Sequence, residues 1–179
     1  MSATVTSKLQ LILGSLLQNT IGVAAATANV DRNTTYSLAS GTAANQADRV
    51  YSATVTRTHG APASDLDLAG VLLDAFGAVI TFVKVKAIVI FAAAANVNSV
   101  VVGGGATAPL DSILFDYVAT ALAQPALKIK PGGMLMLVAP DVNGYAVTAT
   151  TADKLQIASG DEDATTSVSA DIVIIGTSA

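Results

Sequence analysis

Apolar and polar residues alternate over short runs through much of this chain. Strict alternation is typical of a β-strand that buries one face, because successive side chains point to opposite sides of the sheet. Asp65-Leu66-Asp67-Leu68 follows this pattern. Val50–Thr58 also fits a strand, with Val50, Ser52, Thr54 and Thr56 on one side and Tyr51, Ala53, Val55 and Arg57 on the other. We therefore predict a half-buried strand at each of these two places.

Two further regions are apolar almost without interruption. Val79–Val83 leads into Lys84–Phe91 in the middle of the chain, and Val168–Gly176 lies near its end. Short runs rich in β-branched residues are typical of strands that are buried on both faces. We predict one such strand near the end of the chain, and in the middle either one long strand or two strands with a bend.

Turn residues separate the apolar runs at short intervals. The turn signals are Gly41–Asp48, His59–Pro62, Asn96–Asn98, Gly103–Gly105, Pro131–Gly133 and Asn143-Gly144. Further short strands are predicted at Val100–Val102, Leu127–Lys130, Met134–Val138, Tyr145–Thr148 and Asp153–Ile157. Val71–Phe76 fits one helical turn or a loop, and 106–124 fits a short helix or an insertion loop. About eight to ten strands with frequent turns predict an all-β fold, an antiparallel β-sandwich of which the jelly roll is one form.

The first thirty residues fit two patterns. The leucines of Leu9–Leu17 recur at helical spacing, but the first three of them also alternate as in a strand. Gly14 and the threonine-rich flanks weaken a helix. We therefore predict that residues 1–30 form an extended N-terminal arm or edge strand and that 31–179 form the sandwich domain. Asp31–Asn33 is predicted to be a turn, followed by a short strand at Tyr36–Leu38.

The composition favours a protein that is covered by other copies or by a shell. Hydrophobic residues make up 52% of the chain and charged residues only 12%, against about 25% charged in typical soluble domains. Large exposed apolar patches usually mark contacts with other proteins. We therefore expect a homo-oligomer, with a trimer as the preferred number, over the alternative of a monomer with a mild, neutral surface.

Three classes of partner or location are not favoured. The net charge of −4 disfavours nucleic-acid binding, which needs clustered Lys and Arg. The nearest approach to a membrane span or signal peptide, Leu9–Val23, is interrupted by polar residues. The chain has no cysteine, so it has neither disulfides nor thiolate metal sites, which fits reducing cytoplasm or a particle that does not depend on redox state.

The i,i+2 pairs Lys84/Lys86 and Lys128/Lys130 are interpreted as solvated strand faces, the alternative being a polyanion site.

The residues that could carry chemistry are few and scattered. His59 is the single histidine; it sits in a turn signal and is interpreted as an exposed turn residue, which is no evidence for a catalytic triad. Asp65, Asp67 and Asp74 are interpreted as strand-edge or turn-capping residues, with paired-carboxylate acid–base catalysis as the alternative. We expect no catalytic residues and no enzyme activity.

Two loops have compositions that could bind a cation or a phosphate. Asp161-Glu162-Asp163 lacks the alternating spacing of a calcium loop and is interpreted as a solvated hairpin tip, with a cation site as the alternative. Gly103-Gly104-Gly105 lacks the following Gly-Lys-Ser/Thr of a phosphate-binding loop and is interpreted as a tight turn. We therefore expect no cofactor-binding or metal-binding residues.

Several short motifs follow one another in a particular order. They are Gly41–Asp48, Asp65–Gly70, Asp74–Gly77, Asn96–Gly104, Pro131–Gly133, Tyr145–Thr148, Asp153–Leu155 and Asp171–Gly176. Together, over roughly residues 36–179, they resemble a family of small virion structural proteins of tailed bacteriophages, similar to capsid decoration or cement proteins. Thr150-Thr151 and Thr107–Gln124 depart from that pattern. The resemblance implies a structural protein without catalytic residues to carry over.

The resemblance and the composition together give a functional expectation. We expect a component of a tailed-phage virion, assembled in the host cytoplasm: a capsid decoration (cement) protein that binds the head lattice as an oligomer. Its partners would be further copies of itself and the major capsid protein or another virion protein, with no nucleic acid and no membrane. The alternatives are a tail, neck or fibre protein, and a carbohydrate-binding host-attachment module, which the absence of tryptophan and the presence of only four tyrosines disfavour.

Overall fold

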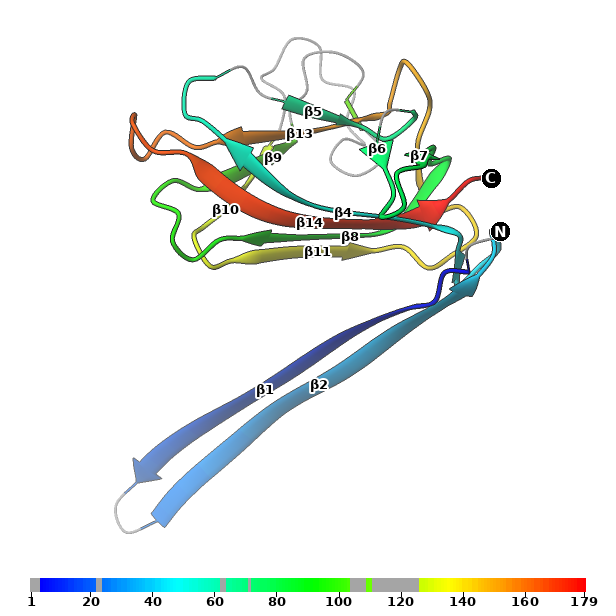
Figure 1. Ribbon diagram of the computed structural model, residues 1–179. Helices are drawn as coiled ribbons and strands as arrows, with labels where there is room; N and C mark the ends of the chain where they lie inside the picture. The colour runs from blue at the N-terminus through cyan, green and yellow to red at the C-terminus, as the bar shows by residue number, and fades with distance from the viewer. Residues whose placement is uncertain (1–3, 22–23, 62–63, 71, 104–108, 111–125) are drawn as a thin grey trace, which may run out of the picture.

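The computed structural model describes residues 4–21, 24–61, 64–70, 72–103, 109–110 and 126–179. The regular secondary structure of these residues consists of β-strands, and the long strands pair antiparallel (Figure 1). The strands are β1 (Ser7–Ile21), β2 (Ala24–Ser40), β3 (Gln46–Ala47), β4 (Arg49–Arg57), β5 (Ser64–Asp67), β6 (Leu72–Leu73), β7 (Val79–Ile80), β8 (Lys84–Ala92), β9 (Val100–Gly103), β10 (Ala126–Ile129), β11 (Met134–Val138), β12 (Tyr145–Ala146), β13 (Lys154–Ser159) and β14 (Val168–Thr177). The predicted all-β fold class is confirmed.

Two sheets form the layers of a sandwich. Sheet 1 has the strand order β11-β8-β14-β4, with β12 also paired to β8, and sheet 2 has the order β10-β9-β13-β5. Figure 1 shows the two layers stacked one above the other. The chain alternates between them, since β4, β8, β11 and β14 belong to sheet 1 while β5, β9, β10 and β13 belong to sheet 2.

The core lies between the inner faces of the two sheets. Sheet 1 contributes Ile88, Ile90, Ile172 and Ile174, and sheet 2 contributes Val100, Val102, Leu155 and Ile157, all at most 2% exposed. Each such side chain stabilises the fold by roughly 1.5–3 kcal/mol through the apolar surface that it removes from water. The central strands β8 and β14 supply the isoleucines because they are flanked on both sides by other strands.

The predicted alternation is confirmed in two strands. In β4, Tyr51 and Val55 are buried in the core while Thr54 and Thr56 are exposed on the outer face. Leu66 of β5 and Leu68 just after it are buried, and the alternating Asp65 and Asp67 are only partly covered.

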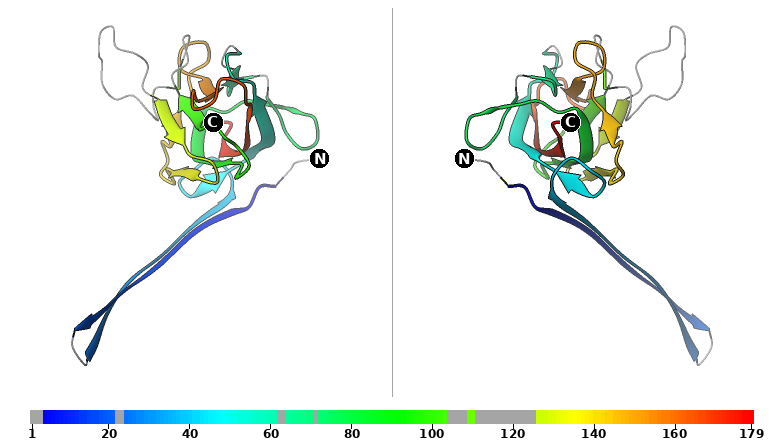
Figure 2. Two further views of the ribbon diagram at one scale, coloured as in Figure 1. Left: turned by 90° about the vertical axis from the view of Figure 1, so that its left-hand side faces the viewer. Right: turned by 90° about the vertical axis from the view of Figure 1, so that its right-hand side faces the viewer.

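The N-terminal region forms one long two-stranded hairpin. β1 and β2 pair antiparallel in an unbroken register that runs from Ser7 opposite Leu38 to Ile21 opposite Ala24. Figures 1 and 2 show the hairpin projecting from one end of the sandwich, on the side of sheet 1. The hairpin continues ten residues past the boundary expected at residue 30, because it ends at Ser40. The turn predicted at Asp31–Asn33 is wrong, since these residues lie inside β2 opposite Gly14, Leu13 and Ile12.

A second, smaller apolar cluster joins the hairpin to the sandwich. Leu9 and Leu38 from the hairpin, and Ala87 and Ile175 from sheet 1, are buried together with Ala47. Since Ala87 and Ile175 belong to the outer face of sheet 1, both faces of the central strands are partly buried, as their continuous apolar sequence predicted.

Lys86 departs from the prediction. It was expected on a solvated strand face, but its side chain is fully buried. The register between β14 and β8 shifts between Ile175 and Gly176, which pair with Ala87 and Val85, so Lys86 is the extra residue of a β-bulge. Its ammonium group donates a hydrogen bond to the backbone carbonyl of Asp141.

Two predicted segments differ in detail. Strand β7 covers only Val79–Ile80 of the strand predicted at Val79–Val83, and it pairs with β6. Val71–Phe76, predicted as one helical turn or a loop, contains the short strand β6 instead. Most of the excursion at 106–124 lies outside the described residues.

The turn predicted at Asn143-Gly144 is confirmed. Gly144 has φ of 59°, and a Cβ there would meet the backbone oxygen of Val85, so both the turn conformation and the space favour glycine. The carboxylate of Asp141 accepts hydrogen bonds from the backbone nitrogens of Asn143 (2.7 Å) and Gly144 (3.0 Å), which fixes this turn.

Candidate interaction surface

The hairpin has one apolar and one polar face, set by the register of its strands. Directly opposed residues of an antiparallel pair share a face, and alternate residues of each strand follow them. The apolar stripe, as we call one face, consists of Ser7, Leu9, Leu11, Leu13, Ser15 and Leu17 with their partners Leu38, Tyr36, Thr34, Arg32, Val30 and Ala28. The stripe therefore carries one charged residue, Arg32, opposite Leu13.

The other face of the hairpin is mainly polar. Its rows are Lys8, Gln10, Ile12, Gly14, Leu16 and Gln18 with Ser37, Thr35, Asn33, Asp31, Asn29 and Thr27. Gln10 donates a side-chain hydrogen bond to Asn33 across the strands at 3.2 Å. Polar side chains of this kind are typical of a solvated strand face.

The stripe is covered only at its base. Leu9 and Leu38 are buried against sheet 1, but beyond them Leu11, Leu13 and Val30 are each about half exposed and Leu17 is 71% exposed. A two-stranded hairpin is at best marginally stable in water without a surface to pack on. A row of exposed leucines on such an element is therefore typical of a contact surface.

The outer face of sheet 1 is also apolar beyond the part that the hairpin covers. Three rows cross its strands, and they are Val138–Ala87–Ile175–Val50, Met136–Val89–Val173–Ser52 and Met134–Phe91–Asp171–Thr54. The first row lies in the seam with the hairpin, and the second is partly buried. In the third row Phe91 is 44% and Met134 49% exposed. The single charged residue in these three rows is Asp171, whose Oδ1 accepts a hydrogen bond from Thr54 Oγ1 at 2.5 Å.

A surface pocket of about 310 Å³ lies beside the base of the hairpin. It is lined by Thr4, Val5, Asp48, Arg49, Val50, Ser52, Asp74, Ala75, Phe76, Ala78, Val79 and Ile80. The turn between β6 and β7 forms one wall, and its Phe76 is 87% exposed. Its charged lining residues, among those that the structure describes, are Asp48, Asp74 and Arg49.

The acidic loop is not a simple solvated tip, because each of its three carboxylates binds other residues of the chain. Glu162 accepts hydrogen bonds from Ser99 N (3.0 Å) and Ser99 Oγ (2.5 Å) and from Lys130 Nζ (3.0 Å). Asp163 Oδ1 accepts from the backbone nitrogen and the hydroxyl of Thr165, both at 2.7 Å. These donors favour the charged forms and lower the pKa of both carboxyls, that of Glu162 strongly.

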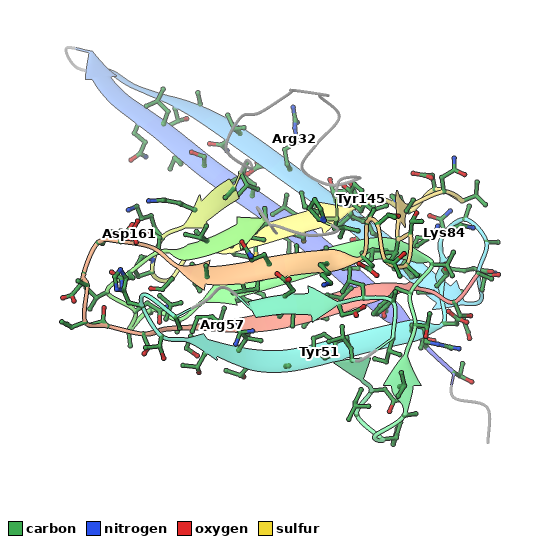
Figure 3. The ribbon with its side chains drawn as sticks, turned by 90° about the horizontal axis from the view of Figure 1, so that it is seen from above. Arg32, Tyr51, Arg57, Lys84, Tyr145 and Asp161 are labelled. Carbon is green, nitrogen blue, oxygen red and sulfur yellow. The ribbon has the colours of Figure 1, made fainter. Side chains whose placement is uncertain are left out.

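The third acidic residue, Asp161, pairs with the histidine. Asp161 Oδ1 lies 3.3 Å from His59 Nε2, and the His59 side chain is only 20% exposed, so it is more covered than its turn position predicted. In Figure 3 Asp161 and Lys84 lie at opposite ends of the sandwich. Among the described residues no three His, Cys, Asp or Glu side chains are grouped so that they could hold a metal ion.

Asp67 and Asp74 act as local turn caps, and Asp65 has a partner on the neighbouring strand. Asp67 Oδ1 accepts from Ala69 N (2.9 Å), and Asp74 Oδ1 accepts from Phe76 N (2.8 Å) and Ala78 N (2.9 Å). Asp65 accepts from Gln156 Nε2 on the neighbouring strand at 3.3 Å. Asp65 and Asp67 share the face of β5 opposite Leu66, as expected, but their carboxylates hydrogen-bond to different partners. The turn-capping interpretation holds for Asp67 and Asp74.

The predictions for the lysine pairs are confirmed only in part, and the prediction for the glycine run is tested only at Gly103. Lys128 and Lys130 are exposed as expected, whereas Lys86 is buried as described above. Burial lowers the pKa of Lys86, and the nearby Asp141 carboxylate opposes that shift. Gly103 ends β9 with φ of 100°, which fits the predicted turn, while Gly104 and Gly105 lie outside the described residues.

Sequence reasoning missed Asn98, which was predicted only as a turn residue. Its fully buried amide donates to Ser159 Oγ (3.1 Å) and to the carbonyls of Asp163 (2.7 Å) and Thr166 (3.1 Å), and its Oδ1 accepts from Asp163 N (2.5 Å). The side chain therefore holds the acidic loop against the start of β9. In the sequence, Asn98 stands just before the apolar run Val100–Val102. An asparagine at such a place fits a turn residue as well as a buried side chain that joins two segments by hydrogen bonds.

The fold and this surface define an all-β sandwich protein with a long hairpin and an exposed apolar stripe. Comparison of the chain with protein families, with curated proteins and with solved structures finds no match. The described residues contain no helix with the length and hydropathy needed to cross a bilayer.

Proposed function

We propose that this protein is a structural component of a tailed-phage virion, a capsid decoration (cement) protein that binds the head lattice as an oligomer. The single observation that carries the proposal is the long hairpin, whose leucine-rich stripe is exposed beyond its base. An apolar projection of this kind gains stability when another protein covers it. The motif resemblance described for residues 36–179 directs the proposal to the virion.

We infer further that the sandwich is a jelly roll. If the eight strands β4, β5, β8, β9, β10, β11, β13 and β14 are numbered in chain order, sheet 1 has the order 6-3-8-1 and sheet 2 the order 5-4-7-2. Two four-stranded sheets joined by this alternation correspond to the two Greek keys of a jelly roll. Viral capsid proteins are among the proteins that use this architecture.

The role is proposed to be structural and not enzymatic. The acidic residues and the histidine that were weighed for catalysis are engaged in separate local contacts, as loop ties and turn caps. A host-attachment role through carbohydrate has less support, because Tyr51 is buried and Tyr36 and Tyr145 are partly buried. Tyr117 lies outside the described residues.

The test removes the distal hairpin and keeps its seam with sheet 1. Residues 11–34 are deleted and Gln10 is joined to Thr35 through an Asn-Gly turn, which leaves Leu9 and Leu38 in place. This cut is cleaner than deletion of residues 1–30, which would remove β1 and leave β2 without its partner. The shortened chain should fold, as measured by circular dichroism, and should no longer co-sediment with empty heads of the source phage.

A matched control keeps the length of the hairpin and changes its polar face. Asn29→Ser and Thr27→Ser should leave binding to the heads unchanged, because both residues lie on the polar face of the hairpin. Hundreds of copies per particle would support the head, while a small multiple of three or six would place the protein in the tail. Normal binding by the shortened chain would contradict the proposal.

A further inference from the structure

We propose that the apolar stripe of one copy packs on the outer face of sheet 1 of a second copy of this chain, with Arg32 of the stripe paired to Asp171 of that face. The inference rests on the proposed function only for its oligomeric part, and it names the surfaces that form the oligomer. Its basis is the register of the hairpin, the composition of the two surfaces and their charges.

The contact between stripe and outer face already exists within one chain. At the base of the hairpin, Leu9 and Leu38 of the stripe are buried against Ala87 and Ile175 of the outer face. The stripe then continues outward through Leu11, Leu13, Val30 and Leu17, and the outer face continues through its second and third rows. Each surface is therefore longer than the part that its own chain covers.

The uncovered parts are of the same chemical kind. The stripe presents leucine and valine side chains that are roughly half exposed or more, and the third row of the outer face presents Phe91 and Met134, each nearly half exposed. Flexible methionine beside an aromatic ring adapts well to aliphatic partners. A hairpin of this length also needs a packing surface that its own sandwich supplies only at the base.

The charges of the two surfaces are complementary. Arg32 is the one charged residue in the twelve positions of the stripe, and Asp171 is the one charged residue in the three rows of the outer face. Neither residue takes part in the ion pairs found among the described residues. Arg32 Nη1 donates only to the neighbouring carbonyl of Asp31 at 3.3 Å, and Figure 3 shows Arg32 on the hairpin. A guanidinium and a carboxylate that meet inside an apolar contact set its register and exclude wrong partners.

Charge reversal tests the pairing in solution, with the full chain and without phage particles. The molar mass of the wild-type chain by size exclusion with light scattering should be a multiple of the chain mass. Arg32→Asp and Asp171→Arg should each weaken self-association by at least about thirty-fold, since breaking one side of a buried pair leaves a like-charge contact. The double variant should regain most of the wild-type association.

The control reverses a neighbouring charge on the polar face of the same hairpin. Asp31→Arg changes the charge as much as Asp171→Arg does, but Asp31 lies opposite Gly14, away from the stripe. It should leave the mass unchanged. Circular dichroism of each variant verifies that the chain is folded.

Three results would overturn the inference: a monomeric wild-type chain, a double variant that stays dissociated although it is folded, or a control that dissociates as much as Asp171→Arg. A monomeric chain that still binds empty heads would overturn this inference and the oligomeric part of the proposed function, but not the decoration role. An oligomer with the expected charge behaviour that ignores the heads would instead contradict the proposed function.

Discussion

Truncation of Leu38 to alanine tests whether the hairpin is seated on the sandwich as described. Leu38 lies near the end of β2, is 1% exposed, and packs in the small cluster with Leu9, Ala47, Ala87 and Ile175. Leu→Ala substitutions at buried sites cost about 2.7–5.0 kcal/mol, and the cost rises with the volume that stays empty. Because this cluster is small and lies on the outside of a sheet, the expected loss is near the lower end, about 3 kcal/mol.

The loss should be visible in both stability and hydrogen exchange. For a domain of this size each kcal/mol lowers Tm by roughly 2–4 °C, so Leu38→Ala should lower Tm by about 6–12 °C. The amides of the seam, in β2 near Leu38 and in β1 near Leu9, should exchange faster. The measurements are thermal unfolding by circular dichroism and exchange followed by mass spectrometry, at one fixed protein concentration because association shifts Tm.

The same substitution on the other face of the same hairpin is the control. Leu16 is exposed and pairs with Asn29 on the polar face, so Leu16→Ala should change the free energy of unfolding by no more than about 0.5 kcal/mol. If Leu38→Ala costs less than about 1 kcal/mol and leaves exchange in the seam unchanged, the hairpin is not anchored by this cluster.

Three further predictions concern polar groups. Asn98→Ala removes the buried amide, whose NH2 group donates to three oxygens within reach and whose Oδ1 accepts from Asp163 N, and should cost about 3–4 kcal/mol in urea unfolding; a cost below that of one ordinary bond would refute the bridging role. Lys86→Ala should destabilise by about 3 kcal/mol, and Lys86→Met should recover more than half of that, because the buried aliphatic stem contributes more than the ammonium group; equal losses would contradict this. The folded-state pKa of Glu162 lies below its ordinary value of 4.5, so its contribution is present above that pH and is lost as the pH falls below it; Tm measured from neutral to acid pH should fall less steeply in Glu162→Gln, and parallel curves would rule the contribution out.

Local patterns predicted much of the sandwich because their causes are local. Alternation predicted the strand at Val50–Thr58 and its two sides, and at Asp65–Leu68 it predicted that the leucines are buried, since the strand repeat of two is a property of the backbone. Asn143-Gly144 predicted a turn because the glycine adopts positive φ without strain.

The same reasoning failed where polarity had another cause. Asp31–Asn33 reads as a turn because polar runs usually interrupt strands at the surface. In the hairpin, however, Asp31 and Asn33 lie on the solvated face and Arg32 lies on the exposed part of the stripe, so polar residues continue the strand. Strict alternation predicted that Lys86 shares the solvated face of Lys84. A β-bulge adds one residue to the strand and so changes which face the following side chains occupy. The bulge depends on the register between β8 and β14, two strands that are distant in the sequence.

By itself the amino-acid sequence determined that the chain is all-β, where most of its strands lie, and that it has far more apolar residues than charged ones. These properties follow from backbone periodicity, turn conformations and side-chain chemistry, which act over a few residues. Only the tertiary structure decided that the N-terminal strands form one long hairpin seated by Leu9 and Leu38, and that the acidic loop is tied to Ser99 and Lys130. The reason is that these contacts join residues tens of positions apart, and the choice among such pairings depends on how the whole chain packs.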